Sequence, residues 1–158
     1  MKRLWSPWRM QYITEGPSDA CIFCVKPREE KDRQNLILHR GDLSYIIMNR
    51  FPYNNGHILI ATYRHVEEFE FLTDEETLEV FQLARKGMNA IAKVMRPEGF
   101  NIGVNQGKAA GGSYRHFHLH VLPRWTADTN FMPTLADSKV ISEHLRQTYR
   151  KLFVAMKS

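Results

Sequence analysis

Hydrophobic and polar residues alternate strictly along residues 116–121, which read HFHLHV. A repeat of two residues is the side-chain period of a β-strand, because successive side chains leave opposite faces. In an extended strand His116, His118 and His120 share one face, while the three apolar residues share the other and can enter a core. We therefore expect a strand whose polar face is a row of imidazoles, on a surface or on the floor of a cleft.

Other apolar runs along the chain have the length and the β-branched content of strands. The expected strands cover residues 35–40, 42–50, 56–63, 100–106 and 115–124, the last of which contains the histidines. Between the second and the third, the sequence RFPYNNG supplies the Pro, Asn and Gly of a tight connection. A connection this short favours an antiparallel pair of strands.

A repeat of three and four residues over 73–95 predicts one long helix. Thr73 and Glu76 have the spacing of a capping box at its start. We expect its apolar stripe to lie in the core: Leu78, Phe81, Ala84, Met88, Ile91, Ala92 and Met95. A second amphipathic repeat predicts a C-terminal helix at about 137–156, with His144 on its surface. The N-terminal stretch to about Lys31 has no regular repeat.

The order of strands, helix, strands and helix indicates an α+β fold, in which helices cover one side of a five-stranded antiparallel sheet. A chain of 158 residues suits one domain, so residues 1–158 are expected to form a single unit. Its N-terminal extension covers about residues 1–20, and Trp5 and Trp8 are expected to pack that extension against the rest.

The chain is basic, with a formal net charge of +5 and a sequence pI of about 9.3. A positive field attracts phosphate-rich ligands. The basic residues are dispersed and form no block, however, which argues against nucleic acid as the main ligand. No apolar run approaches the roughly 20 residues that span a bilayer, and the first residues lack the apolar region of a secretory signal. We therefore expect a cytoplasmic protein without a membrane partner.

The two cysteines, Cys21 and Cys24, form a CxxC pair. Disulfide frameworks are rare in the cytosol, so the pair is either half of a zinc site or a redox motif. Redox pairs usually open a helix after a strand, and the turn-like TEGPSDA precedes Cys21 instead. The context favours a metal site, provided that two more ligands exist.

Three readings are open for the alternating histidines: a metal site, structural imidazoles hydrogen-bonded to the backbone, or nucleophilic catalysis. The preceding loop, NQGKAAGGS over 105–113, favours phosphate chemistry because its glycines let backbone N–H groups approach a phosphate. A neutral imidazole can attack phosphorus and form a phosphoramidate. His118 is best placed for this, provided that one ring nitrogen is protonated and points away while the other stays free.

These motifs resemble the histidine triad (HIT) superfamily. Its His-x-His-x-His signature, followed by two apolar residues, matches HFHLHVL at 116–122. NRFPYNNGHILI at 49–60 matches its upstream block, with Asn49 eight residues before His57, and CIFC is also common in the family. The likeness covers residues 21–125. It implies a HIT-like fold, in which His118 is the nucleotidylated nucleophile, and His57 and His120 contact the phosphates and stabilise the transition state.

The resemblance also implies a set of nucleotide contacts. Asn49 would bind the ribose hydroxyls, and Asn105 would bind a phosphate. Ser113 would contact phosphate or the leaving group, and the amide of Gly112 would assist it. Apart from the resemblance, the indole of Trp125 at the edge of the site is expected either to stack on a base or to pack at a dimer surface.

One departure points to a branch of the superfamily. The hydrolase branch has glutamine four residues before the first triad histidine, where this chain has Gly112. GxxAGGS, HxHxHVxPRW, DxNF and the N-terminal RLWxPxRMxY are similar to the bacterial diadenosine tetraphosphate (Ap4A) phosphorylases. That likeness implies that phosphate, in place of water, attacks the nucleotidyl-histidine, giving ATP and ADP. The alternatives are hydrolysis of dinucleoside polyphosphates or phosphoramidates, and a zinc-stabilised binding module without turnover.

Zinc and assembly follow from the same resemblance. Related uridylyltransferases bind zinc with a CxxC pair, a histidine after the third strand and the first triad histidine. Here these are Cys21, Cys24, His65 and His116, with His39 as a spare candidate; the alternative is that the cysteines are ordinary buried thiols. The family pairs two subunits into a continuous sheet, which implies a homodimer, and no organic cofactor is implied.

Overall fold

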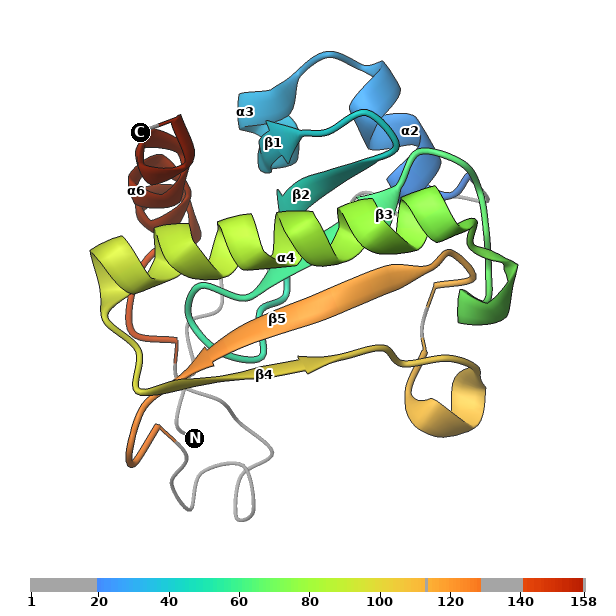
Figure 1. The fold of residues 1–158 in the computed structure, drawn as a ribbon. Coiled ribbons are helices and arrows are strands. Elements are labelled where there is room, and N and C mark those ends of the chain that lie inside the picture. The colour runs from blue at the N-terminus through green and yellow to red at the C-terminus, as the bar shows by residue number, and fades with distance from the viewer. Residues whose placement is uncertain (1–19, 113, 129–140, 158) are drawn as a thin grey trace, which may run out of the picture.

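The computed structural model describes residues 20–112, 114–128 and 141–157 (Figure 1). Its centre is a five-stranded antiparallel sheet in the order β1-β2-β3-β5-β4. This confirms the α+β fold and the five predicted strands. The strands are β1 (Ile37–Arg40), β2 (Ser44–Met48), β3 (Ile58–Thr62), β4 (Gly99–Gly103) and β5 (His118–Arg124).

The predicted long helix is α4 (Asp74–Met95), which lies across one face of the sheet (Figure 1). Its capping box forms as expected. The Thr73 hydroxyl accepts a hydrogen bond from the N–H of Glu76 at 3.1 Å, and the Glu76 carboxylate accepts one from the N–H of Thr73 at 3.0 Å. The helix therefore begins where the sequence predicts it.

The predicted apolar stripe of α4 is wrong at three positions. Leu78 and Phe81 are 61% and 52% exposed, and Ala92 is exposed as well. The buried stripe is instead Glu76, Val80, Leu83, Ala84, Gly87, Ala90 and Ile91. Gly87 gives the physical reason, because a Cβ there would lie 2.3 Å from Cδ1 of Ile58. The helix approaches the sheet at this glycine, and its buried stripe is centred on it.

The C-terminal helix is α6 (Leu145–Lys157), so its predicted start at about residue 137 is wrong. Residues 137–140 lie outside the described part of the chain, and 141–144 are not helical. His144 stands just before the helix and caps it. Its carbonyl accepts from the N–H of Thr148 at 3.2 Å, and its ring Nδ1 accepts from the N–H of Arg146 at 3.3 Å. A capping histidine carries none of the usual sequence signals of an N-cap.

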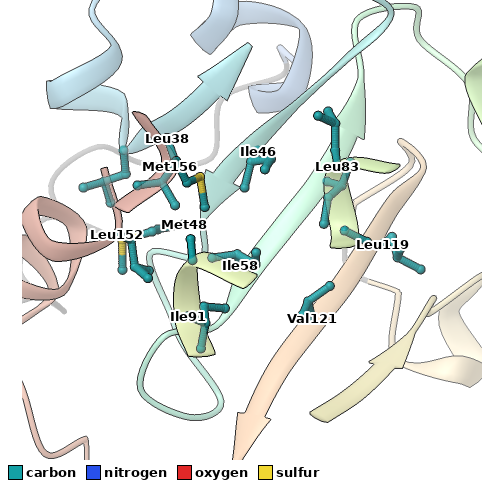
Figure 2. Close-up of a cluster of buried hydrophobic side chains, with 14 of the residues drawn as sticks. Leu38, Ile46, Met48, Ile58, Leu83, Ile91, Leu119, Val121, Leu152 and Met156 are labelled. Carbon is teal, nitrogen blue, oxygen red and sulfur yellow. The ribbon is translucent and has the colours of Figure 1, made fainter. Parts of the chain in front are cut away.

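The main core fills the space between the sheet and the two long helices. Figure 2 shows side chains from the strands meeting those from α4 and α6: Leu38, Ile46, Met48, Ile58, Leu83, Ile91, Leu119, Val121, Leu152 and Met156. The phenol of Tyr149 on α6 also donates to the carbonyl of Ile37 at 2.9 Å. These contacts leave the other face of the sheet to a second, smaller cluster.

Two short helices that the sequence did not indicate precede β1: α2 (Ile22–Arg28) and α3 (Asp32–Asn35). Because Phe23 of α2 packs on the second face of the sheet, the expectations of an irregular stretch to Lys31 and of helices on one side alone are wrong. Phe23 of α2 is buried in a cluster with Ile37, Tyr45, Ile47, Leu59 and Ala61. A seven-residue helix that contains Pro27 and lacks a side-chain cap has little intrinsic stability. Its position therefore depends on the contacts of Phe23.

Two single turns of 3-10 helix complete the described elements. They are η1 (Phe69–Phe71), just before α4, and η2 (Lys108–Ala110), in the glycine-rich loop between β4 and β5. Among the described residues, no helix has both the length and the apolar character needed to cross a bilayer.

Candidate functional site

The histidines of β5 face the second, smaller cluster. His118 pairs with Ala61 of β3 and His120 with Leu59, so their side chains share the face of those two residues. The prediction of a common face is confirmed for His118 and His120, but both imidazoles are only 6% exposed. These two imidazoles are thus nearly buried and do not lie on an open surface, the first of the two locations expected for the row. The start of the strand at residue 115 is also wrong, because β5 begins at His118.

His118 has the protonation pattern that a nucleophile needs. Its Nδ1 lies 2.7 Å from the carbonyl oxygen of His116, and a carbonyl oxygen can only accept. Nδ1 therefore carries the proton and donates it to His116, and Nε2 keeps its lone pair. Burial lowers the pKa of His118, which keeps the ring neutral at pH 7.

A second pair of imidazoles has its tautomers fixed by a chain of hydrogen bonds. The backbone N–H of Tyr53 donates to Nδ1 of His57 at 3.1 Å, so that nitrogen is an acceptor. Nε2 of His57 must then carry the proton, and it donates to Nδ1 of His120 at 2.9 Å. The remaining proton of His120 lies on Nε2, which is buried and has no partner among the described residues. His120 thus presents an unused N–H donor beside His118.

Burial and mutual repulsion keep this pair uncharged. Burial is the main cause that lowers the pKa of His57 to about 3, and the neighbouring imidazoles His120 and His118 lower it further. Burial, followed by His118, lowers the pKa of His120 to about 4. An anionic oxygen placed beside Nε2 of His120 would accept a hydrogen bond from a neutral donor that already points to it.

Asn49 and Tyr53 hold His57 from the connection between β2 and β3. Nδ2 of Asn49 lies 3.2 Å from Nδ1 of His57, and its Oδ1 accepts from the N–H of Phe51 at 2.9 Å. The Tyr53 ring stacks on His120 with centroids 5.8 Å apart, and also contacts His57 at 4.8 Å. Tyr53 was missed by sequence reasoning, since a tyrosine in a turn carries no distinctive signal.

The glycine-rich loop turns back on itself before β5. The N–H of Gly112 donates to the carbonyl of Gly107 at 3.0 Å, so this predicted phosphate donor is engaged within the loop. A Cβ at position 112 would lie 2.7 Å from the carbonyl oxygen of Asn105. Close approach of two backbone segments therefore explains the glycine. Ser113 lies outside the described residues.

Four predicted metal ligands come together beside this site. Sγ of Cys21 and of Cys24 lie 3.3 and 3.6 Å from Nδ1 of His116, and Nδ1 of His65 lies 3.2 Å from the same atom. All four ligand atoms lie within 4.8 Å of one another. A tetrahedral zinc with ordinary bond lengths separates its ligand atoms by about 3.3 to 3.8 Å. The arrangement therefore fits one ion.

The orientation of His116 also suits a metal ligand. Its Nε2 lies 2.9 Å from the carbonyl of Thr62 and donates to it, which leaves the lone pair of Nδ1 facing the two thiols. The spare candidate, His39, is not in the group. Its pKa is lowered by burial and by Lys86 of α4, which places it near that helix.

Trp125 lies at the end of β5 in a polar network. Its backbone N–H donates to the carboxylate of Asp128 at 3.0 Å, and Nε of Arg124 donates to the same carboxylate at 2.7 Å. Asn54, which follows Tyr53, donates to Asp128 at 2.8 Å. Asp128 thus ties the end of β5 to the connection that carries Tyr53, a link between distant segments that no local pattern reveals.

Comparison with known proteins identifies relatives of this chain. The profile of the HIT domain matches residues 30–127. An AP-4-A phosphorylase of Mycobacterium tuberculosis is 43% identical over 162 aligned residues, which cover 96% of this chain and 83% of the relative. An asymmetrical bis(5'-nucleosyl)-tetraphosphatase of Schizosaccharomyces pombe is 35% identical over a region that covers 58% of this chain and 50% of the relative.

A solved structure supports the same grouping at the level of the fold. The zinc-bound histidine triad family protein of Mycobacterium smegmatis superposes with a TM-score of 0.72 at 22% identity, over 87% of this chain and 94% of that one. Together with the matched profile and the sequence identity to the first relative, the five-stranded fold and its alternating histidines leave one conclusion: this chain belongs to the HIT domain family.

Proposed function

We propose that this chain is a nucleotidyltransferase that cleaves diadenosine polyphosphates by phosphorolysis, turning Ap4A and phosphate into ATP and ADP. The observation that carries the proposal is the state of His118, which is neutral, has its Nδ1–H donated to His116, and keeps the lone pair of Nε2. The 43% identity to an AP-4-A phosphorylase supports the choice of reaction.

The reaction takes place in two displacements. Nε2 of His118 attacks the α-phosphorus at one adenylyl end of Ap4A. A nitrogen–phosphorus bond forms, and the bond from that phosphorus to the bridging oxygen breaks, releasing ATP. Inorganic phosphate then attacks the adenylyl group, the nitrogen–phosphorus bond breaks, and ADP leaves while His118 recovers its lone pair. Nε2–H of His120 donates to the phosphoryl oxygens as their charge grows, and a donor of this kind is worth on the order of 10²- to 10³-fold in kcat.

The predicted nucleotide contacts enter this proposal with different support. Asn49 already orients His57, and it is also proposed to meet the ribose hydroxyls. Asn105, Gly112 and Ser113 are proposed to meet phosphate. The N–H of Gly112 must first leave the carbonyl of Gly107 if it is to donate to a ligand. Trp125 is proposed to contact a base.

Phosphate dependence tests the reaction. Purified protein is incubated with Ap4A, with and without inorganic phosphate, and the nucleotides are separated by chromatography. We expect ADP and ATP with phosphate, and no more than one equivalent of ATP per active site without it. Sustained phosphate-independent release of AMP would show that the protein is a hydrolase. The similarity to the tetraphosphatase of Schizosaccharomyces pombe is the reason to test for this outcome. Binding without any turnover would identify a non-catalytic module.

Zinc is proposed as the ion of the Cys21–Cys24–His65–His116 group, where it would have a structural role. Two thiols and two imidazoles are the donor set of a closed structural zinc site, and the distances fit tetrahedral coordination. The free thiols of both cysteines also suit the reducing cytoplasm, the proposed compartment. Metal analysis of the purified protein, compared with Cys24→Ser, tests the site; a parent protein without zinc would contradict it.

A homodimer is proposed from the open edge of the sheet. β4 is the last strand in the order, and its outer edge pairs with no other described strand (Figure 1). Ile102 on that strand is exposed, and α4 also carries two exposed apolar side chains, Leu78 and Phe81. An unpaired edge strand beside exposed apolar residues is a template for a second copy. Two such edges would form one continuous ten-stranded sheet.

A further inference from the structure

Phe23 lies between the cysteine–histidine group and the imidazole of His118, and it is neither a metal ligand nor a reacting group. Its ring is 1% exposed and stacks on the His118 ring, with centroids 4.8 Å apart and planes 23° apart. The same ring contacts His116 at 5.4 Å and meets Tyr114 edge to face at 5.7 Å. One side chain thus contacts three alternate residues just before and at the start of β5.

Hydrogen bonds alone leave His118 incompletely fixed. The bond from Nδ1 to the carbonyl of His116 sets which nitrogen is protonated, but turning the ring about its Cβ–Cγ bond would break that hydrogen bond and release the tautomer. A flat ring stacked on the imidazole removes this freedom, because rotation would drive one edge into the stack. His120 limits the ring on another side, with centroids 4.9 Å apart. Phe23 therefore supplies the surface on which the imidazole rests.

The position of Phe23 is in turn set by its neighbours in sequence. Cys21 and Cys24 bracket it on α2, and both thiols lie within 3.6 Å of Nδ1 of His116. The carbonyl of Phe23 accepts from the buried phenol of Tyr45 at 2.8 Å. Since α2 has seven residues, an internal proline and no side-chain cap, these tertiary contacts decide where its first turn lies.

We infer that Phe23 is a positioning residue: its ring holds the His118 imidazole in the attacking orientation, and the cysteine–histidine group holds that ring in place. The inference rests on the proposed function in one respect, the nucleophilic role of His118. It goes further by giving the metal group a second effect. Besides anchoring α2, an ion bound there fixes the alignment of a nucleophile that it does not touch.

The test compares Phe23→Leu with Ile37→Val. Both substitutions remove buried apolar volume from the same cluster, and Ile37 is on β1, which β2 and β3 separate from the histidine strand. For Phe23→Leu we expect unchanged zinc content, KM within about twofold of the parent, and kcat lower by on the order of 10- to 100-fold, the penalty of a misaligned reacting group. Ile37→Val should keep the parental kcat.

A spectroscopic measurement separates positioning from general destabilisation. In protein labelled with ¹⁵N-histidine, the two ring nitrogens of His118 report its tautomer without any substrate. The parent and Ile37→Val should show one Nδ1–H tautomer, and Phe23→Leu should show an average of two. Parental kcat and a single tautomer in Phe23→Leu would overturn the inference, as would equal losses in Ile37→Val.

The role of the metal group is tested on the parent protein, so it does not depend on how a variant folds. Removing zinc with a chelator should convert the single His118 tautomer into a mixture, and returning zinc should restore it. A signal that does not change on removal of the ion, or a zinc-free parent with one tautomer, would overturn the coupling. If the parent lacks turnover while these tautomer changes occur, the proposed function fails and the positioning inference stands.

Discussion

The hydrogen bond from His57 to His120 gives the sharpest prediction of the account. Replacing His57 by leucine removes the donor that lies 2.9 Å from Nδ1 of His120. His120 is then free to protonate either nitrogen, and the tautomer that carries a proton on Nδ1 offers a lone pair, not a donor, to the phosphoryl oxygens. Where that tautomer predominates, the transition state loses a hydrogen bond to a charged acceptor, which is worth about 1.5 to 3 kcal/mol and is the largest effect expected.

Converted at about 1.4 kcal/mol per factor of ten, this loss is about a 10- to 150-fold decrease in kcat. The assay is the single-turnover rate of ATP release from saturating Ap4A, which isolates the first displacement. His57→Gln is the matched control, because its amide N–H can still donate to His120, and it should retain more of the rate than His57→Leu. If folded His57→Leu releases ATP at the parental rate, the proposed tautomer chain has no catalytic role.

Three further outcomes follow from the same geometry. The pKa values of about 3 for His57 and about 4 for His120 lie below the unfolded value of 6.5, so the unfolded chain takes up protons first as the pH falls. Each imidazole should therefore lower the free energy of unfolding by about 2 kcal/mol between pH 6.5 and pH 5. Urea unfolding measures this change, and a midpoint that does not depend on pH would contradict it. Gly112→Ala should displace the loop, because its Cβ would meet the carbonyl of Asn105 at 2.7 Å, and should lower kcat without changing the zinc content; parental activity would show that the loop conformation is not required. Phe81→Glu should shift the sedimentation of the protein from dimer to monomer, and an unchanged dimer would place the interface elsewhere.

Local sequence patterns predicted an element correctly where interactions between residues close in sequence determine it. The alternation of His118 and His120 with apolar residues predicts a strand, because side chains on a strand have a period of two, whereas His116 lies before β5. Thr73 and Glu76 predict the start of α4 because the capping box is made within four residues. The metal group, in contrast, was found by resemblance, since residues 21 and 116 meet through the folding of the whole sheet.

Other features depend on tertiary packing and have no local signal. The buried stripe of α4 is set by the close approach of Gly87 to Ile58, so the periodic repeat of apolar residues places Leu78 and Phe81 on the wrong side. The segment of α2 has a low intrinsic helix propensity, and the packing of Phe23 against the ring of His118 stabilises the helix. The directions of the imidazole protons follow from backbone groups at Tyr53 and His116, which a sequence pattern does not reveal.

The proposed mechanism requires that Nε2 of His118 attacks phosphorus and then carries the adenylyl group. Brief reaction with Ap4A in the absence of phosphate, followed by quenching at alkaline pH and peptide mass spectrometry, measures this step directly. We expect one adenylyl group per chain, attached to His118, that is absent from a folded His118→Asn variant and disappears from the parent when phosphate is added. Full turnover by His118→Asn, or an adenylyl group on another residue, would contradict it.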